Sequence, residues 1–319
     1  MVQFDETREE FKGFTDYYIS ELEPVLSKAE GDRVKAVSKF KKVAGLIFVV
    51  TLGLAGLAIL KTGSVVPVLF VTGFGVVAIF AAFFYCLNDI KAQTKMTLVS
   101  GICRYVGWTF SETVAVPPDL DILKENGLLP RRYHRAAFED EMKGHVHGAD
   151  FKAVEAHLER KDTDSDGDTK WVTVFRGSLM EIDSHREFLG KTVVLRDAGF
   201  FNRKKRSGMK RVGLVDPVFE RIFEAYGTDQ VEARYLLTPT FMQRLIDLET
   251  SVDGKRIRFG FIDGRLLIAV ETPNRFEAGS MLKPLTDTER TQKILKEVDA
   301  VFGVVDGLMK PQSPVNFNT

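Results

Sequence analysis

Two apolar stretches decide the fold: Val43–Leu60, with the sequence VAGLIFVVTLGLAGLAIL, and Val65–Leu87, with the sequence VVPVLFVTGFGVVAIFAAFFYCL. They contain 18 and 23 residues without one Asp, Glu, Lys or Arg. An α-helix rises about 1.5 Å per residue and the hydrocarbon core of a bilayer is about 30 Å thick, so each stretch is long enough to cross it. Buried helices of soluble proteins rarely run this far without a polar face. The two stretches therefore predict a transmembrane hairpin over residues 43–87.

The distribution of cations around this hairpin predicts its orientation. The link between the spans, residues 61–64, is too short for anything but an antiparallel turn, so both ends emerge on one side of the membrane. Lys61 is the one cation of the link, whereas the flanks carry Lys28, Arg33, Lys35, Lys39, Lys41, Lys42, Lys91, Lys95 and Arg104. Cytoplasmic segments hold the excess of Lys and Arg, so we expect a multi-pass protein with both termini in the cytoplasm.

Residues 1–42 predict two cytoplasmic helices, an amphipathic one over 5–22 and a basic one that Pro24 starts and that continues into the first span. The apolar stripe of the first helix is expected to pack within the protein, with another subunit or the membrane surface as alternatives. It consists of Phe4, Phe11, Phe14, Tyr18 and Leu22. Residues 88–150 predict a helical linker region. Five span glycines allow close helix contact or reflect ordinary membrane composition: Gly45, Gly53, Gly56, Gly73 and Gly75.

A soluble domain over residues 151–309 is predicted by a change to alternating periodicity. The clearest signal is Asp263-Gly264 between two alternating runs, Arg256–Ile262 and Arg265–Val270, because both residues of such a hairpin turn need positive φ. Helices are expected at 217–225, 229–236 and 239–250, and another from the capping box Thr286-Asp-Thr-Glu289. Hairpins mixed with helices predict an α+β domain with a mainly antiparallel sheet and flanking helices, and residues 310–319 a disordered tail.

Composition and motifs argue against several classes of function. Lys+Arg and Asp+Glu are both 44, and this zero net charge does not favour nucleic acid as a partner. Cys86 and Cys103 form no disulfide framework and no zinc motif, so two reduced thiols are expected. The nucleotide-binding glycine patterns, the nucleophile elbow and the H-E-x-x-H motif are missing from the sequence. It therefore predicts no catalytic residues and no cofactor.

Two groups of residues are weak candidates for metal binding. His145 and His147 are two residues apart, which would place both imidazoles on one side of an extended segment, yet a solvated loop explains them equally simply. The run of Asp162, Asp164 and Asp166 matches the first half of an EF-hand loop. Thr173 stands where that loop needs a bidentate Glu, so an acidic hairpin turn is the preferred interpretation.

A basic cluster is a candidate for lipid contact. Its six cations lie within nine residues: Arg203, Lys204, Lys205, Arg206, Lys210 and Arg211. A solvated loop between strands is the usual explanation. Here the loop would be tethered near an anionic cytoplasmic leaflet, where each cation contributes on the order of 1 kcal/mol to binding.

Four segments carry a resemblance to a known family. They are Val174-Phe-Arg-Gly177, Phe188–Leu195, Asp216-Pro-Val-Phe219 and, most specifically, Thr228-Asp-Gln-Val-Glu-Ala-Arg-Tyr-Leu-Leu-Thr-Pro239. The chain resembles the bacterial membrane-protein family known as domain of unknown function 3137. The resemblance implies a protein of the bacterial inner membrane with a cytoplasmic domain, and it implies no chemistry.

These observations lead to two main hypotheses. The first, preferred over an enzyme, is a membrane-anchored interaction or scaffold protein whose partners are the lipid bilayer and either another protein or further copies of itself. The alternative is a membrane-associated enzyme that uses a metal at the His145/His147 region or at the acidic loop. A homo-oligomer that serves transport is a weaker third, because the spans lack a polar lining and neither carries an ionisable group at mid-depth.

Overall fold

The computed structural model describes residues 2–163, 167–183, 188–196, 208–214, 216–251 and 255–309. They form two compact units, one made of Met1–Gly101 with Glu277–Ile294, the other of Ile102–Phe276 with Leu295–Thr319.

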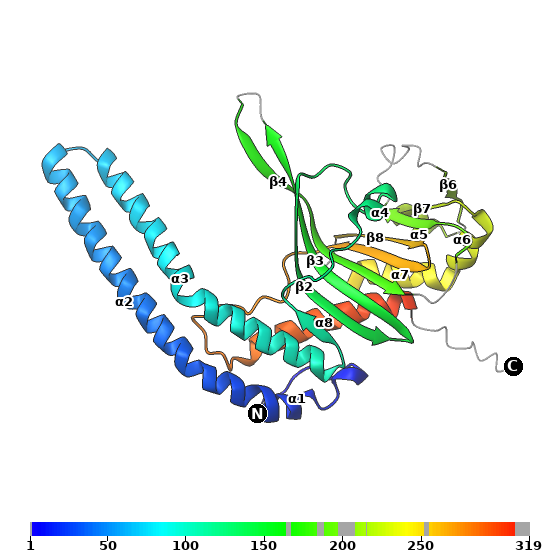
Figure 1. The fold of residues 1–319 in the computed structure, drawn as a ribbon, viewed down its shortest axis with the longest axis horizontal. Coiled ribbons are helices and arrows are strands. Elements are labelled where there is room, and N and C mark those ends of the chain that lie inside the picture. The colour runs from blue at the N-terminus through cyan, green and yellow to red at the C-terminus, as the bar shows by residue number, and fades with distance from the viewer. Residues whose placement is uncertain are drawn as a thin grey trace. The chain divides into compact units, whose positions relative to one another are not determined.

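The first unit is built on two long helices, α2 (Glu23–Thr62) and α3 (Val66–Tyr105), which run antiparallel in Figure 1. Gly63 ends α2 in the left-handed conformation, with φ 63°, which glycine adopts at little cost. The predicted spans therefore lie inside longer helices: α2 includes the basic segment before the first span, and α3 continues through residues 88–105, as expected.

Both helices are long and apolar enough to cross a membrane. Only 6% and 11% of their most apolar windows are covered by the rest of the protein. Leu60, Phe70 and Phe74 are 85%, 76% and 78% exposed, which is the reverse of a soluble core helix. Such a continuous apolar surface is unfavourable in water and favourable in lipid.

The N-terminal segment departs from the prediction at Pro24. Short elements precede α2, namely η1 (Glu9–Phe11), α1 (Phe14–Tyr17) and the π-helical η2 (Tyr18–Leu22), and the last of these joins α2 without a break. Pro24 lies in the first turn of α2, as predicted, but the expected end of the preceding helix there is wrong. A proline lacks an N–H and crowds the preceding turn, and the wider π-helical turn in front of it lets the helix continue.

The aromatic stripe of this segment packs inside the first unit, as predicted. Phe4, Phe11, Phe14 and Tyr18 are all at least 95% buried, and the ring centroids of Phe4 and Tyr18 lie 4.8 Å apart. The Tyr17 hydroxyl donates a hydrogen bond of 3.2 Å to the carbonyl of Gly101.

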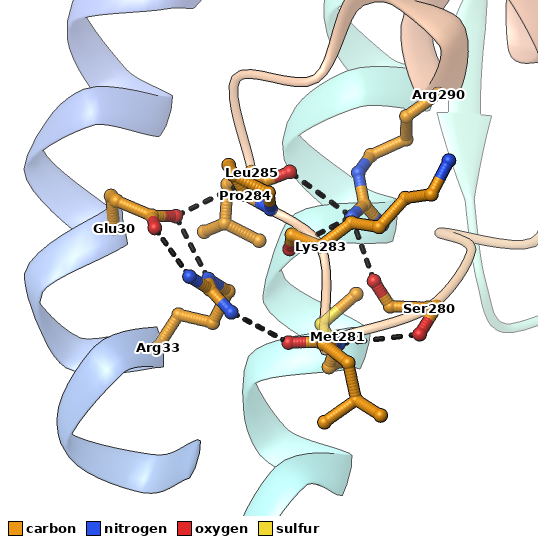
Figure 2. A network of polar contacts seen from close by, with 9 residues as sticks. Glu30, Arg33, Ser280, Met281, Lys283, Pro284, Leu285 and Arg290 are labelled. Carbon is orange, nitrogen blue, oxygen red and sulfur yellow. Dashed lines mark hydrogen bonds and ion pairs between the residues drawn. The ribbon is translucent and has the colours of Figure 1, made fainter. Parts of the chain in front are cut away.

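A second part of the first unit, residues 277–287, is held by two arginines (Figure 2). Arg33 on α2 donates to the Met281 carbonyl at 2.9 Å and pairs with Glu30 at 2.6 Å, while Glu30 accepts from the Leu285 N–H at 2.8 Å. Arg290 donates to the carbonyls of this segment at Ser280, Lys283 and Pro284. Hydrogen bonds from Arg33 lower the pKa of Glu30. The ionised form of Glu30 is therefore favoured where this pair binds residues 277–287.

The second unit contains a nine-stranded sheet in the order β1-β2-β3-β4-β9-β8-β5-β7-β6, in which every pair is antiparallel. The α+β prediction is confirmed. The strands are β1 (Thr109–Ser111), β2 (Arg135–Val146), β3 (Ala149–Thr163), β4 (Thr169–Asp183), β5 (Thr192–Arg196), β6 (Lys210–Val212), β7 (Phe223–Gly227), β8 (Lys255–Ile262) and β9 (Arg265–Glu271). The β8–β9 turn is the predicted one, since Asp263 and Gly264 have φ 50° and 77°.

The helices are α4 (Leu120–Glu125), α5 (Pro217–Ile222), α6 (Gln230–Leu236), α7 (Pro239–Ser251) and α8 (Thr288–Met309). Asp287 rather than Thr286 caps α8, because its carboxylate accepts the Glu289 N–H at 3.1 Å. The helix expected at 217–225 ends at Ile222, and β7 follows at once.

The region expected to be a helical linker, residues 88–150, is helical only in α3 and α4. Its residues 135–146 instead form β2, which pairs with β3 through a two-residue turn at His147 and Gly148. Both turn residues have positive φ, 53° and 78°. The sheet thus begins before the predicted boundary at residue 151.

The sheet has a buried core on each face. On one face, Val154, Leu179 and Leu267 pack with the α4 residue Leu123 and the following Leu128. On the other, Trp108 packs against Phe151 of β3 and Phe302 of α8, with ring centroids 4.7 and 4.0 Å away.

Candidate functional site

The histidines of the predicted metal site each pair with a different carboxylate. His145, on β2, has Nδ1 2.7 Å from an Asp150 carboxylate oxygen across the strand pair. His147, in the following turn, contacts Asp306 of α8 at 2.7 Å. No group of three possible metal ligands occurs among the residues that the structure describes. Each of the two imidazoles therefore interacts with its own carboxylate, and the described residues supply no third ligand for a shared metal site.

The acidic loop connects β3 to β4, as the hairpin interpretation predicts. Asp162 pairs with Arg160 at 3.5 Å, and Thr173 lies within β4. Asp164 and Asp166 lie outside the described residues. The position of Thr173 in a strand is incompatible with the second half of an EF-hand loop.

Most of the basic cluster, Arg203, Lys204, Lys205 and Arg206, lies outside the described residues. Lys210 and Arg211 belong to β6, at one edge of the sheet, and both are exposed. Arg211 is 4.0 Å from Glu224 on the neighbouring strand. Lipid contact at this cluster stays a prediction.

A buried carboxylate that the sequence did not indicate lies on the α8 face of the sheet. Glu155 of β3 is 7% exposed, and its strand neighbours are Glu139 on β2 and Ser178 on β4. The Arg275 N–H donates to its carboxylate at 3.1 Å. The next N–H along, that of Phe276, donates to Glu297 of α8 at 2.6 Å. Two carboxylates thus hold the loop that follows β9.

The environment of Glu155 disfavours its charge. Burial raises the pKa of Glu155 to about 8, and the nearby charge of Asp140 acts in the same direction. Asp140 and Phe276 both have positive φ, 58° and 54°, which L-residues adopt at a cost. Asp140 lies at a break in the β2–β3 register, between Glu139 and Met142, where a bulge accommodates this conformation. Carboxyl burial and backbone strain thus coincide at this position.

The cavity on the opposite face is too small for a ligand. It is lined by charged groups, among them Lys152, Glu181 and Arg265, and by apolar residues such as Val154 and Leu179. Its volume is about 20 Å³, room for one or two water molecules. Arg265 and Glu181 pair with each other at 2.8 Å.

A much larger open groove lies beside β4. It has a volume of about 590 Å³ and is lined by residues 173–176 of β4 and residues 271–273 at the end of β9. Its size and openness would let it hold a segment of another molecule. Nothing in the local sequence pattern indicates it, because it arises where two strands that are distant in the sequence stop pairing.

Two reduced cysteines were predicted, and both thiols are free. Cys103 is completely buried, and burial raises its pKa to about 12. A thiol in this state is unreactive, which gives it a packing role.

The comparisons with known proteins give a family without an assigned activity. The model of a protein family of unknown function, DUF3137, matches residues 173–310, which confirms the resemblance predicted from the sequence. A search of curated proteins finds no match. The solved structures include the mycobacterial trehalose monomycolate transport factor A, TtfA, which aligns at 9% identity and a TM-score of 0.30 over 69% of this chain and 97% of that one.

Proposed function

We propose that this protein is a two-pass anchor of the bacterial inner membrane that holds a partner-binding α+β domain in the cytoplasm. The observation that carries the anchoring is the uncovered apolar surface of α2 and α3, which lipid would cover. The excess of cations at the open end of the hairpin supports cytoplasmic termini.

The partner-binding role is supported by the groove beside β4. Scaffold proteins act by holding a partner, and an open groove next to an exposed strand is a surface that a protein segment can occupy. The metal-enzyme alternative gains no support from the separate pairings of His145 and His147.

The proposal is tested by extraction and purification of the full-length protein. It should stay in membranes during an alkaline carbonate wash and enter solution only with detergent. After in-cell crosslinking, it should purify with one protein partner in a fixed ratio. Recovery of the protein alone under every crosslinking condition would contradict the interaction role. Release by carbonate would contradict the anchor.

A further inference from the structure

Strand β4 is paired on both sides over only half of its length. Its residues 177–183 pair with β9, from Gly177 opposite Glu271 to Asp183 opposite Arg265. One further hydrogen bond joins the Thr272 N–H to the Arg176 carbonyl at 3.1 Å. Residues 169–175 pair with β3 on one side, and on the other side no strand of the described residues pairs with them. The β3–β4 hairpin consequently extends beyond the neighbouring strands (Figure 1).

The groove beside this edge is the space that a longer β9 would fill. Strand β9 ends at Glu271, and Thr272 and Pro273 follow. Proline has no N–H to donate to the ladder, so pairing stops there. The groove is lined by these two residues and Glu271 on one side and by residues 173–176 on the other. The groove therefore lies between the unpaired edge of β4 and the end of β9, where a longer β9 would pair with β4.

The exposed edge has a sequence that favours pairing. Residues 169–175 are Thr-Lys-Trp-Val-Thr-Val-Phe, rich in β-branched and aromatic side chains and without Pro or Gly. Natural proteins usually shorten or block such edges, because unpaired N–H and C=O groups recruit further strands. Seven paired residues would extend about 23 Å at about 3.3 Å per residue, enough for a specific contact.

The charges of this edge indicate what kind of strand fits. Lys170 and Arg176 are both exposed, and neither has a carboxylate within ion-pair distance among the described residues. Three acidic groups nearby form ion pairs with other cations: Glu159 with Arg135, Asp162 with Arg160 and Glu271 with Arg258. Arg176 also contributes to lowering the pKa of Glu159, and Asp162 lies opposite Lys170 in the strand pair. The edge therefore presents two exposed cations that are outside close ion pairs among the described residues. A second copy of β4 would bring the same cations and is disfavoured by like-charge repulsion.

We infer that the free edge of β4 at residues 169–175, with the Arg176 side chain at its inner end, binds an extended, acidic segment of a partner protein as an added strand. This inference rests on the proposed function and names the chemistry of the partner. Backbone hydrogen bonds along the edge supply affinity, while Lys170 and Arg176 select acidic sequences at the two ends of the contact.

The test uses the full-length protein in detergent and synthetic peptides as probes. A short fluorescent peptide of alternating Val, Thr and Glu should bind, and its Lys counterpart should bind at least tenfold more weakly. Two further acidic peptides are N-methylated at alternate amides, in complementary patterns. Because alternate N–H groups of a strand point to the same neighbour, one pattern should abolish binding and the other should leave it. Equal effects of the two patterns would overturn strand addition.

Charge-reversal variants locate the site. K170E/R176E should lose at least tenfold in affinity for the acidic peptide, whereas the control R234E/K296E, which reverses two exposed cations elsewhere, should bind like wild type. Amide exchange should slow at residues 169–175 on peptide addition. Undiminished binding by K170E/R176E, or protection that rises with protein concentration without peptide, would overturn the inference. Either result would leave open the recovery of a partner by crosslinking in cells. Failure of the strand-addition inference can therefore be told apart from failure of the proposed function.

Discussion

At the scale of single residues, Glu155 has a pKa raised well above the ordinary value of a glutamate. It lies on a buried face with Glu139 beside it, and the backbone N–H of Arg275 donates a hydrogen bond to it. A charged carboxylate there costs free energy, so the neutral form is favoured in the folded protein.

This environment predicts that stability falls as pH rises. Below the unfolded pKa of about 4.5, Glu155 is neutral in both states, and its contribution is fully present. As pH rises toward the folded pKa of about 8, the unfolded chain releases the proton first, so that stability is lost. Glu155→Gln keeps the side chain neutral. It should raise the free energy of unfolding above about pH 8 by roughly 3 kcal/mol and leave it unchanged near about pH 4.

The check is thermal unfolding of the full-length protein in detergent between about pH 4 and pH 9. Glu159→Gln on the same strand is the control. Hydrogen bonding by Arg135 lowers the pKa of Glu159, so its contribution is present above the unfolded pKa and is lost as pH falls. If the stability of Glu155→Gln and that of the wild type change with pH in parallel, the folded protein does not hold Glu155 in its neutral form.

Arg33 and Lys35 provide a second residue-scale comparison on one helix. Each pairs with a carboxylate three residues earlier, Arg33 with Glu30 and Lys35 with Asp32. The Arg33 side chain is 9% exposed and also binds the Met281 carbonyl, whereas Lys35 is 81% exposed. Arg33→Ala should destabilise the protein by about 1–3 kcal/mol, because it removes the donor to the Met281 carbonyl and the cation that pairs with Glu30. Lys35→Ala should change stability by less than about 0.5 kcal/mol.

Limited proteolysis of these two variants provides an independent measurement. Loss of Arg33 should expose residues 277–287 to cleavage, and loss of Lys35 should not. Equal cleavage in both variants would show that Arg33 does not hold this segment.

At the scale of elements, the sequence predicts those whose signal is local. The β8–β9 hairpin follows from Asp263-Gly264, and α6 from the Asp229 cap, whose carboxylate accepts two N–H groups at 2.8 Å. Strand β2 was not predicted because the bulge at Asp140 interrupts its alternation. Strand β7 was not predicted because Phe223–Gly227 follows α5 directly and continues its apolar pattern. The groove at β4 depends on where the distant β9 ends, which no local pattern encodes.

The glycines of the two spans have different surroundings in the structure, a difference that the sequence did not indicate. A Cβ at Gly75 would lie 2.5 Å from the Thr51 hydroxyl, whereas one at Gly73 would meet nothing within 4 Å. Small residues let membrane helices approach closely. Gly75→Leu should therefore destabilise the hairpin by about 1–3 kcal/mol, through overpacking against α2. Gly73→Leu adds the same side chain to an open surface and should have an effect within about 0.5 kcal/mol.

Both variants can be compared by titration with sodium dodecyl sulfate in mixed micelles, with helicity as the signal. The midpoint for Gly75→Leu should fall below that of Gly73→Leu. If the two midpoints fall together, Gly75 has no special contact and the five glycines reflect ordinary membrane composition.

At the scale of the whole molecule, the charge distribution predicts one orientation in the membrane. Lys61 is the one cation in the link between the spans, and nine cations flank the hairpin at its open end, from Lys28 to Lys42 and from Lys91 to Arg104. The excess of Lys and Arg stays in the cytoplasm.

With Cys86 and Cys103 replaced by Ser, a single Cys at Gly63 should react with an impermeant maleimide added outside intact spheroplasts. A single Cys at Gln3 or Leu189, two exposed positions on either side of the hairpin, should react only after the membrane is opened. Labelling of Gln3 and Leu189 but not Gly63 in intact spheroplasts would reverse the orientation and remove the cytoplasmic partner. Labelling of all three would mean that the apolar helices do not cross the bilayer, because a protein attached to the outer surface alone exposes every site.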